Sequence, residues 1–323
     1  MENILLIDWL SITTKELDAL GFQKLLGMEN VPWETINGQH GYQDRLYFSG
    51  ISIHFNGRKD MGVWLEMSGQ GCRTYESLGS GDFERLFDFV LSGHGNITRL
   101  DVAYDDHSGL LDISQLEQDA KAGNIVSRFR KYGAEWERDR SGDGVTVKVG
   151  SQKSDIYLRI YDKAVERHCH PGTHWIRVEL QLRRDRARKF IELDGDYGER
   201  FSGVLANYVR FVEPLEEDTN KWRWPMKAYW ADFLGDAVRI SLYEKPGMEY
   251  NIDHLENYVF RQAGNAIDAA LQIFGIRCFL DKLKDRHTIP NPKYKQLVDK
   301  LFHLGQQFED VPADRRFADD PFF

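Results

Sequence analysis

An acidic residue inside an apolar strand is the first candidate for chemistry. Residues 97–104 are rich in strand-forming types and carry Asp101 in their interior, ahead of Asp105 and Asp106. Alternate residues of a strand face the same side, so Asp101 and Asp105 share a face with Ala103 between them. An unpaired buried carboxylate is costly, which favours a function for Asp101, whereas Asp105 would also fit a simple turn. Two carboxylates beside a small residue leave room for a hard cation, Mg²⁺ or Mn²⁺.

A second strand with one polar face lies at residues 175–182. Arg177, Glu179 and Gln181 alternate with apolar residues, so the three share a face. An isolated Arg-x-Glu pair on a strand is usually a surface ion pair of little energetic worth. Here the polar face needs a partner, which the Asp101 strand could supply. Glu179 is then the candidate third ligand of the cation.

A tyrosine between two cations is the third candidate. Arg159 and Tyr161 alternate along a strand expected at residues 156–161, and Lys163 continues the same alternation just beyond it. A phenol has a pKa near 10 and is a poor nucleophile at neutral pH. A neighbouring cation favours the phenolate and also neutralises a phosphate, as covalent attack on a phosphodiester requires. The alternative is an ordinary strand with an aromatic residue and cations on its solvent face.

The charge distribution limits the mode of nucleic-acid binding. The 323-residue chain has 42 Lys+Arg against 51 Asp+Glu, a formal net charge of −9. A purely electrostatic nucleic-acid binder would usually be basic overall. The charge is uneven, however, because residues 159–189 hold nine Lys/Arg and four acids. Residues 183–189 could follow a phosphate backbone or be a solvated helix start, and residues 221–224 could stack an unpaired base or be buried.

Composition also indicates the cellular compartment. No stretch approaches the roughly 20 apolar residues that a membrane helix requires. The first residues lack a basic segment followed by an apolar one, so we expect no cleaved export signal. The three cysteines are far apart and odd in number, which indicates reduced thiols. We therefore expect a cytoplasmic protein that does not associate with a membrane.

The order of the expected elements predicts an α+β fold, an antiparallel β-sheet core with flanking helices and a mainly helical C-terminal part. We expect an N-terminal segment over 1–40, a core over 41–215, and a helical region with a partly extended tail over 216–323. Beyond the strands above, the pattern predicts strands at 45–55, closed by a turn at Asn56-Gly57, and at 62–68, 134–138 and 145–150. A loop is expected at 69–72. Helices are expected at 82–91 with Asp82 as N-cap, from Ser114 to Gly123, and at 199–212, 225–235 and 253–284.

Several motifs in a fixed order resemble the replication initiation factor family, which comprises rolling-circle initiators of small plasmids and replication proteins of filamentous phages. The similarity covers roughly residues 40–235. It rests on Gly-Ser-x-x-Ser-Asp-x-x-x-Arg-Ile-Tyr-Asp-Lys from Gly150 and on Trp-x-Arg-x-Glu ending at Glu179. Further matches are Ser-Gly-Gln-Gly-Cys-Arg from Ser68, Thr-Arg-Leu-Asp-Val-Ala-Tyr-Asp from Thr98, and Arg-Phe-Val-Glu from Arg210 near Arg223-Trp-Pro.

The resemblance implies a DNA strand-nicking and strand-transferring endonuclease. Tyr161 would attack a backbone phosphate of origin DNA (single-stranded, hairpin or cruciform), stay joined to the 5′ end and free a 3′-OH for a polymerase. Lys163 and Arg159 would stabilise charge on the phosphate, and Asp101 and Glu179, with Asp105, would hold Mg²⁺ or Mn²⁺. A host helicase and polymerase and a second copy of the chain are the implied partners. The chain lacks the His-hydrophobic-His strand motif of better-known rolling-circle nickases.

Two other functions remain open from the sequence. One is a catalytically inactive DNA-binding regulator or accessory replication factor, whose DNA binding would be indifferent to Tyr161, Asp101 and Glu179. The other is a phosphodiesterase that uses a metal-bound water and forms no protein–DNA bond. Tyr157, four residues before Tyr161, is a candidate second tyrosine on the same strand face.

Overall fold

The chain divides into two compact units. The computed structural model describes residues 3–139, 142–170, 172–238, 241–242, 259–260 and 263–284. The first unit is Met1–Tyr243 and the second is Glu244–Phe323. The sequence pattern predicts boundaries after residues 40 and 215, whereas the first unit runs through both positions. Its first forty residues are not a separate segment, because they supply a strand to the middle of the main sheet.

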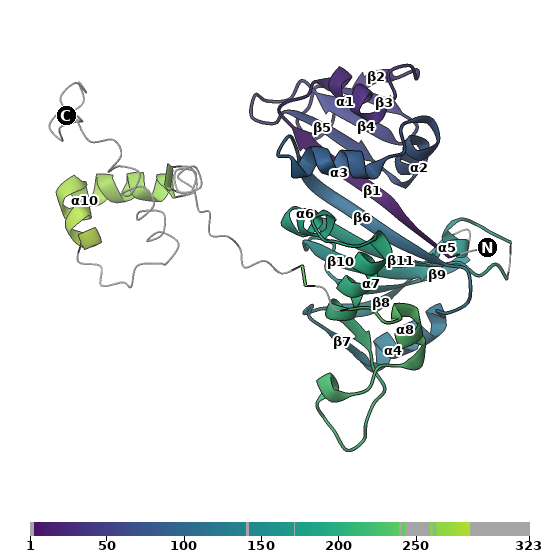
Figure 1. Ribbon diagram of the computed structural model, residues 1–323. Helices are drawn as coiled ribbons and strands as arrows, with labels where there is room; N and C mark the ends of the chain where they lie inside the picture. The colour runs from purple at the N-terminus through teal and green to yellow at the C-terminus, as the bar shows by residue number, and fades with distance from the viewer. Residues whose placement is uncertain are drawn as a thin grey trace. The chain divides into compact units, whose positions relative to one another are not determined.

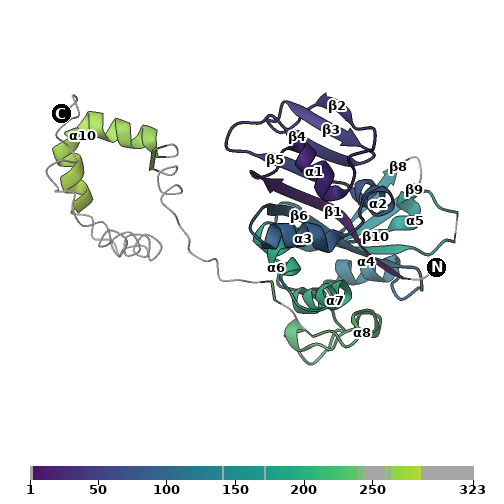
Figure 2. The same ribbon diagram turned by 45° about the horizontal axis from the view of Figure 1, so that its top comes forward.

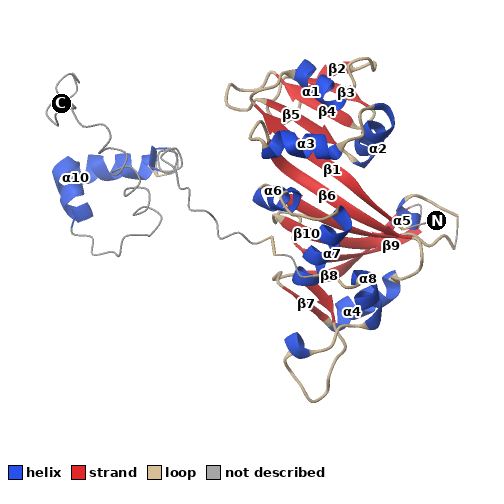
Figure 3. Ribbon diagram, in the orientation of Figure 1, coloured by secondary structure: helices blue, strands red, loops and turns tan. Residues whose placement is uncertain are grey.

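A ten-stranded sheet forms the body of the first unit (Figure 1, Figure 3). Its order is β2-β3-β4-β5-β1-β6-β11-β10-β9-β8, and each neighbouring pair is antiparallel. A second sheet pairs β7 with β12. The strands are β1 Ile4–Thr14, β2 Glu34–Asn37, β3 Asp44–Phe48, β4 Ile51–Phe55, β5 Val63–Met67, β6 Asn96–Asp106, β7 Ile125–Ser127, β8 Tyr132–Asp139, β9 Gly142–Gly150, β10 Ile156–Asp162, β11 Ile176–Arg183 and β12 Val209–Phe211.

Helices cover one face of this sheet. In Figures 1 and 2, α3, α6 and α7 lie along the same side of the central strands. Alternate residues of those strands, such as Val102, Leu158 and Leu180, are buried in the hydrophobic core. Each such side chain contributes about 1.5–3 kcal/mol on burial. The helices of this unit are α1 Ala19–Leu26, α2 Gly69–Leu78, α3 Phe83–Leu91, α4 Ile113–Ala122, α5 Lys163–Glu166, α6 Asp185–Ile191, α7 Tyr197–Tyr208, α8 Ala228–Leu234 and the 3₁₀ turn η1 Lys221–Arg223.

The predicted fold class is confirmed, and so are several of its helix signals. Asp82 caps α3 by accepting from the Arg85 amide. Gly123 ends α4 in the left-handed conformation that glycine adopts most readily. The cap of α4 is Asp112, two residues before the expected Ser114. The second unit contains α10, Gly264–Lys284, which confirms helical structure in this part of the range predicted over 253–284, with a non-helical kink at Gly275 that was not predicted. The expected extended tail lies outside the described residues.

Two local predictions, a single strand at 45–55 and a loop at 69–72, are wrong because two glycines allow the backbone to turn and to pack closely there. The strand predicted at 45–55 is two strands, because Ser49 and Gly50 have φ of 41° and 88° and form a tight turn between β3 and β4. Positive φ at both central residues is what the favoured two-residue hairpin turn requires. The loop predicted at 69–72 is the first turn of α2, capped by Ser68. A side chain at Gly71 would meet the Gly50 carbonyl oxygen at 2.2 Å, so this helix start and this turn depend on both glycines.

The helix predicted over 199–212 stops earlier than expected. Helix α7 ends at Tyr208, and residues 209–211 turn into strand β12, which pairs with β7. No helix in the described part of the chain is long and apolar enough to cross a membrane.

His54 is a neutral packing residue on the face of the sheet opposite to the core. It is fully buried and stacks on Trp64, with ring centroids 4.3 Å apart. Neither ring nitrogen has a hydrogen-bond partner among the described residues. Burial, with help from the charges of Arg45 and His40, lowers the pKa of His54 to about 4. The imidazole therefore stays uncharged at neutral pH.

We expect His54 to make stability depend on pH. Between pH 6.5 and 4 the unfolded chain takes up a proton on this ring that the folded chain does not, so the free energy of unfolding falls as pH falls. The loss from pH 7.5 to pH 4 should be about 3 kcal/mol. Urea denaturation at several pH values measures this loss. The free energy of unfolding of His54→Phe should fall less between pH 7.5 and pH 4 than that of the wild type, because the variant lacks the titrating ring. Identical slopes for the two proteins would contradict the assignment.

Candidate active site

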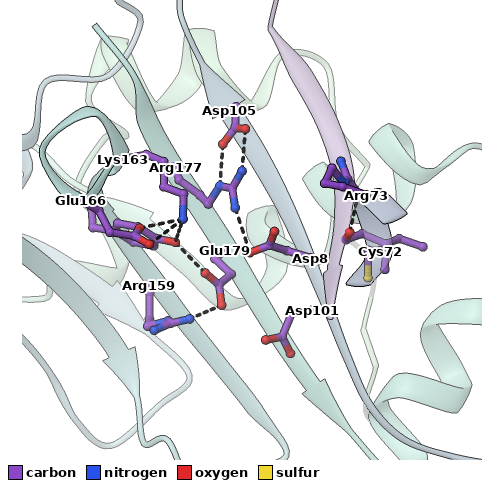
Figure 4. A network of polar contacts seen from close by, with 12 residues as sticks. Asp8, Cys72, Arg73, Asp101, Asp105, Arg159, Lys163, Glu166, Arg177 and Glu179 are labelled. Carbon is purple, nitrogen blue, oxygen red and sulfur yellow. Dashed lines mark hydrogen bonds and ion pairs between the residues drawn. The ribbon is translucent and has the colours of Figure 1, made fainter. Parts of the chain in front are cut away.

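Three central strands bring the predicted site residues to one face of the sheet. Across β10 and β11, Arg159 lies opposite Glu179, and Tyr161 lies opposite Arg177. Across β11 and β6, Gln181 lies opposite Asp101. Because strand side chains alternate, all of these point away from the helix-covered core. Figure 4 shows the resulting network of carboxylates and cations.

The Tyr161 hydroxyl lies closer to a carboxylate than to a cationic side chain. It donates a hydrogen bond of 3.0 Å to Glu179 Oε2, while Lys163 Nζ lies 3.5 Å away. Lys163 is itself engaged by both carboxylate oxygens of Glu166, at 2.8 and 2.7 Å. Burial, followed by the charges of Glu179 and Glu166, raises the pKa of Tyr161. The phenol is therefore protonated at rest, and Glu179 is placed to accept its proton.

Both predicted carboxylates of the central pair are almost completely buried and bound to arginine. Glu179 is ion-paired with Arg159 from β10. Asp101 receives two hydrogen bonds from Arg99, at 2.9 and 2.5 Å, and the Arg99 guanidinium lies 4.2 Å from the Trp9 ring centroid. Burial raises the pKa of Asp101 to about 7, against the opposing effect of Arg99 and with a contribution from the charge of Glu179. The two carboxylates are thus close enough to influence each other.

Asp105 has a different environment from the one expected. It accepts two hydrogen bonds from Arg177, at 2.6 and 2.7 Å. Arg177 also pairs with Asp8, at 2.8 Å. Asp105 is not among the residues that line the cavity beside Tyr161, whereas Asp8 is.

Asp8 is a site residue that the sequence analysis missed. It is the extra residue of a β-bulge, because Ile7 pairs with Val102 and Trp9 pairs with Asp101, the residue before it. The available signal was an acid within the apolar run of residues 4–10, the same argument that identified Asp101.

A cavity of about 530 Å³ opens over these side chains. The first turn of α2 forms one wall with Ser68, Gly69 and Gln70. A side chain at Gly69 would lie 2.7 Å from Asp8 Oδ1, so the close approach of helix and strand requires glycine. The polar lining residues from the strands are Asp8, Arg99, Asp101, Thr146, Lys148, Arg159, Tyr161, Asp162 and Glu179.

The donor set of this cavity suits a hard divalent cation by its chemistry. Asp8, Asp101 and Glu179 supply carboxylate oxygens, the ligands that Mg²⁺ and Mn²⁺ prefer. Each is engaged with an arginine, and within the described ranges no three His, Cys, Asp or Glu residues are arranged as a metal-binding group. A cation would therefore have to compete with guanidinium groups for these oxygens.

Two family models cover most of the chain. Residues 95–285 match the family described as replication initiation factor, and residues 4–92 match the rolling circle replication initiation protein N-terminal domain. Together they begin much nearer the N-terminus than the motifs of the sequence indicated. The chain belongs to the replication initiation factor family.

Individual relatives agree with this assignment. A protein of Bacillus subtilis (strain 168) described as "Putative DNA relaxase NicK" is 31% identical over 263 residues, which is 76% of this chain and 74% of the relative. The structure of a rolling circle replication initiator protein from Geobacillus stearothermophilus superposes with a TM-score of 0.68 at 32% identity. It covers 75% of this chain and 100% of the other.

The buried charge cluster predicts a large stability effect at Arg177. Replacing Arg177 by Ala leaves Asp8 and Asp105 facing each other without a cation, so the free energy of unfolding should fall by about 3–5 kcal/mol. Urea denaturation at pH 7 measures this change. Arg58→Ala is the matched control, because its pair with Asp60 is exposed and should contribute nothing measurable. Equal effects of the two substitutions would contradict the structural role of Arg177.

Proposed function

We propose that this protein starts rolling-circle replication by cutting one strand of origin DNA and joining itself to the new 5′ end through Tyr161. The observation that carries the proposal is the hydrogen bond from the Tyr161 hydroxyl to the buried Glu179 carboxylate, beside a cavity lined by both cations and carboxylates. A tyrosine that merely packs in a core would not need an ionised acceptor and two neighbouring cations. Membership of the replication initiation factor family supports the same conclusion.

The proposed chemistry follows from the contacts of the phenol. Tyr161 Oη attacks the scissile phosphorus while Glu179 accepts the phenolic proton, so the nucleophile forms only as the reaction proceeds. The bond from phosphorus to the 3′ oxygen breaks, which leaves a phosphotyrosine on the 5′ side and a 3′-OH that takes its proton from solvent. Arg159 and Lys163 lie 5.7 and 5.4 Å from the centre of the Tyr161 ring and would stabilise charge on the phosphate.

Asp101, Glu179 and Asp8 are the residues that we propose to hold Mg²⁺ or Mn²⁺. A divalent cation bound there would polarise the scissile phosphate. Asp8 replaces the Asp105 of the sequence analysis in this role, because Asp8 lines the cavity and Asp105 is engaged by Arg177. The host helicase and polymerase, and a second copy of the chain, stay as predictions.

The tyrosine assignment is tested by trapping the covalent product. With labelled single-stranded origin DNA and Mn²⁺, the wild type should give a protein–DNA adduct that survives denaturing electrophoresis, and Tyr161→Phe should give none. Tyr157→Phe is the matched control: Tyr157 lies on the same strand face but does not line the cavity, so the adduct should persist. An adduct that survives Tyr161→Phe would remove the proposed nucleophile.

The same assay separates the alternatives. Cleavage by a metal-bound water would give turnover without an adduct in the wild type. A catalytically inactive regulator would bind origin DNA but neither cut it nor respond to Tyr161→Phe.

The cation ligands are tested without activity, by Mn²⁺ titration of the protein alone followed by electron paramagnetic resonance. Asp101→Asn and Asp8→Asn should each weaken Mn²⁺ binding by at least about tenfold, because each removes an anionic oxygen ligand. Asp105→Asn should leave the affinity within about twofold of the wild type. The reverse order, with Asp105 dominant and Asp8 silent, would reinstate the ligand set expected from the sequence.

A further inference from the structure

Arg183, the last residue of β11, is a cation on the sheet face that carries Tyr161 and Glu179, and it has no counter-ion among the described residues. Its neighbours Ile176 to Leu182 alternate between core and open face, which places Arg183 on the same face as Glu179 and Gln181. Across the ladder it lies opposite Arg99 of β6. Its Nε is buried and has no hydrogen-bond partner among the described residues. The two acids that attract its charge pair with other arginines, Asp101 with Arg99 and Asp155 with Arg184, and no ion pair of the described residues includes Arg183.

The local charges do not balance around this guanidinium. The charges of Arg99 and Arg184 repel that of Arg183, and the acids whose charges attract it are Asp101 and Asp155. Asp101 is taken by Arg99, and Asp155 pairs with Arg184. Three cations therefore share two carboxylates. Burial and the two neighbouring arginines lower the pKa of Arg183, so the folded chain bears a free-energy cost for keeping this charge there. A bound anion would remove that cost.

The other cations of the basic run at 183–189 are already engaged. Arg184 pairs with Asp155, Arg188 and Lys189 pair with Glu192, and Arg186 donates to the Leu242 carbonyl. From the sequence, the run is either a track for a phosphate backbone or a solvated helix start. In the structure the strand ends at Arg183 and α6 begins at Asp185, so the run leaves the catalytic face after its first residue.

The position of Arg183 suits contact with the DNA strand that Tyr161 would cut. Glu179, which contacts Tyr161, lies four residues earlier on the same strand face, about 13 Å away along β11. Arg99, opposite Arg183, lines the cavity itself. A DNA strand whose scissile phosphate lies at Tyr161 would therefore bring a neighbouring phosphate, a few nucleotides away, over Arg183.

We propose that Arg183, assisted by Arg99, binds one backbone phosphate of the DNA strand beside the cleavage position and so sets where the scissile phosphate lies. Arg183 is a positioning residue, because it does not contact the reacting atoms. The proposal rests on the proposed function in one respect, that the strand passes through the cavity at Tyr161.

Equilibrium binding at several salt concentrations provides the first test. Tyr161→Phe protein prevents cleavage, and Arg183→Gln and Arg184→Gln are compared in that background on single-stranded origin DNA. Arg183→Gln should weaken binding by about tenfold at 0.1 M salt and reduce the slope of log affinity against log salt by about 0.7, the value for one phosphate contact on a single strand. Arg184→Gln should change neither quantity appreciably. Equal effects of the two variants, or an unchanged slope for Arg183→Gln, would overturn the proposal.

A neutral-phosphate scan locates the contact. One methylphosphonate is placed at each position in turn along the DNA. The Tyr161→Phe parent should lose affinity at several positions, one of them a few nucleotides from the cleavage bond, and Arg183→Gln should lack the loss at that one position. An unchanged pattern of losses in Arg183→Gln would overturn the proposal. Arg183→Lys, which keeps the charge, should recover part of the affinity, and matching melting curves for all variants exclude a folding defect.

The two proposals fail separately. If the wild-type adduct forms but the scan is the same with and without Arg183, only the phosphate contact is wrong. If the scan shows the Arg183 contact but no adduct forms, DNA binding across this face stands and the nicking chemistry is wrong.

Discussion

Pairing of buried carboxylates with arginines from adjoining strands is the constraint on which the rest of this structure depends. Removing a charge from water costs several kcal/mol, and the cost is recovered only where an opposite charge lies in good hydrogen-bonding geometry. Here Glu179 faces Arg159, Asp105 faces Arg177, and Asp101 faces Arg99. The first two pairs cross from one strand to the next, so they are satisfied in a single register of β10, β11 and β6. The register that buries the core also assembles the candidate site.

The same pairing sets the electrostatic state of the tyrosine. Glu179 is shared between Arg159 and the Tyr161 hydroxyl, and Lys163 is largely neutralised by Glu166. The phenol thus rests in a protonated form next to a carboxylate whose charge is held by an arginine. This arrangement differs from the simple picture of a phenolate between two cations that the strand pattern suggested. A proton acceptor in contact with the hydroxyl suits a phenol whose pKa burial has raised.

The sequence predicted the residues of the central site but not all of their partners. Period-two alternation was sufficient to place Asp101, Glu179, Arg159 and Tyr161 on polar strand faces, because the geometry of a single strand fixes which residues share a side. The contacts between strands depend on non-local register, which no local pattern reveals. Asp105 was therefore assigned to a cation although Arg177 binds it. Asp8 was missed because residues 1–40 gave no clear element and a bulge breaks the alternation on which the prediction relied.

The bulge in β1 has a consequence for what one strand can offer to a ligand. Asp8 and Trp9 are consecutive in sequence, yet both line the cavity. In a regular strand, consecutive side chains point to opposite sides of the sheet, so either Asp8 or Trp9 would point into the hydrophobic core. A single extra residue thus lets β1 present an aromatic ring and a carboxylate side by side at the wall of the cavity, which a regularly alternating strand does not do.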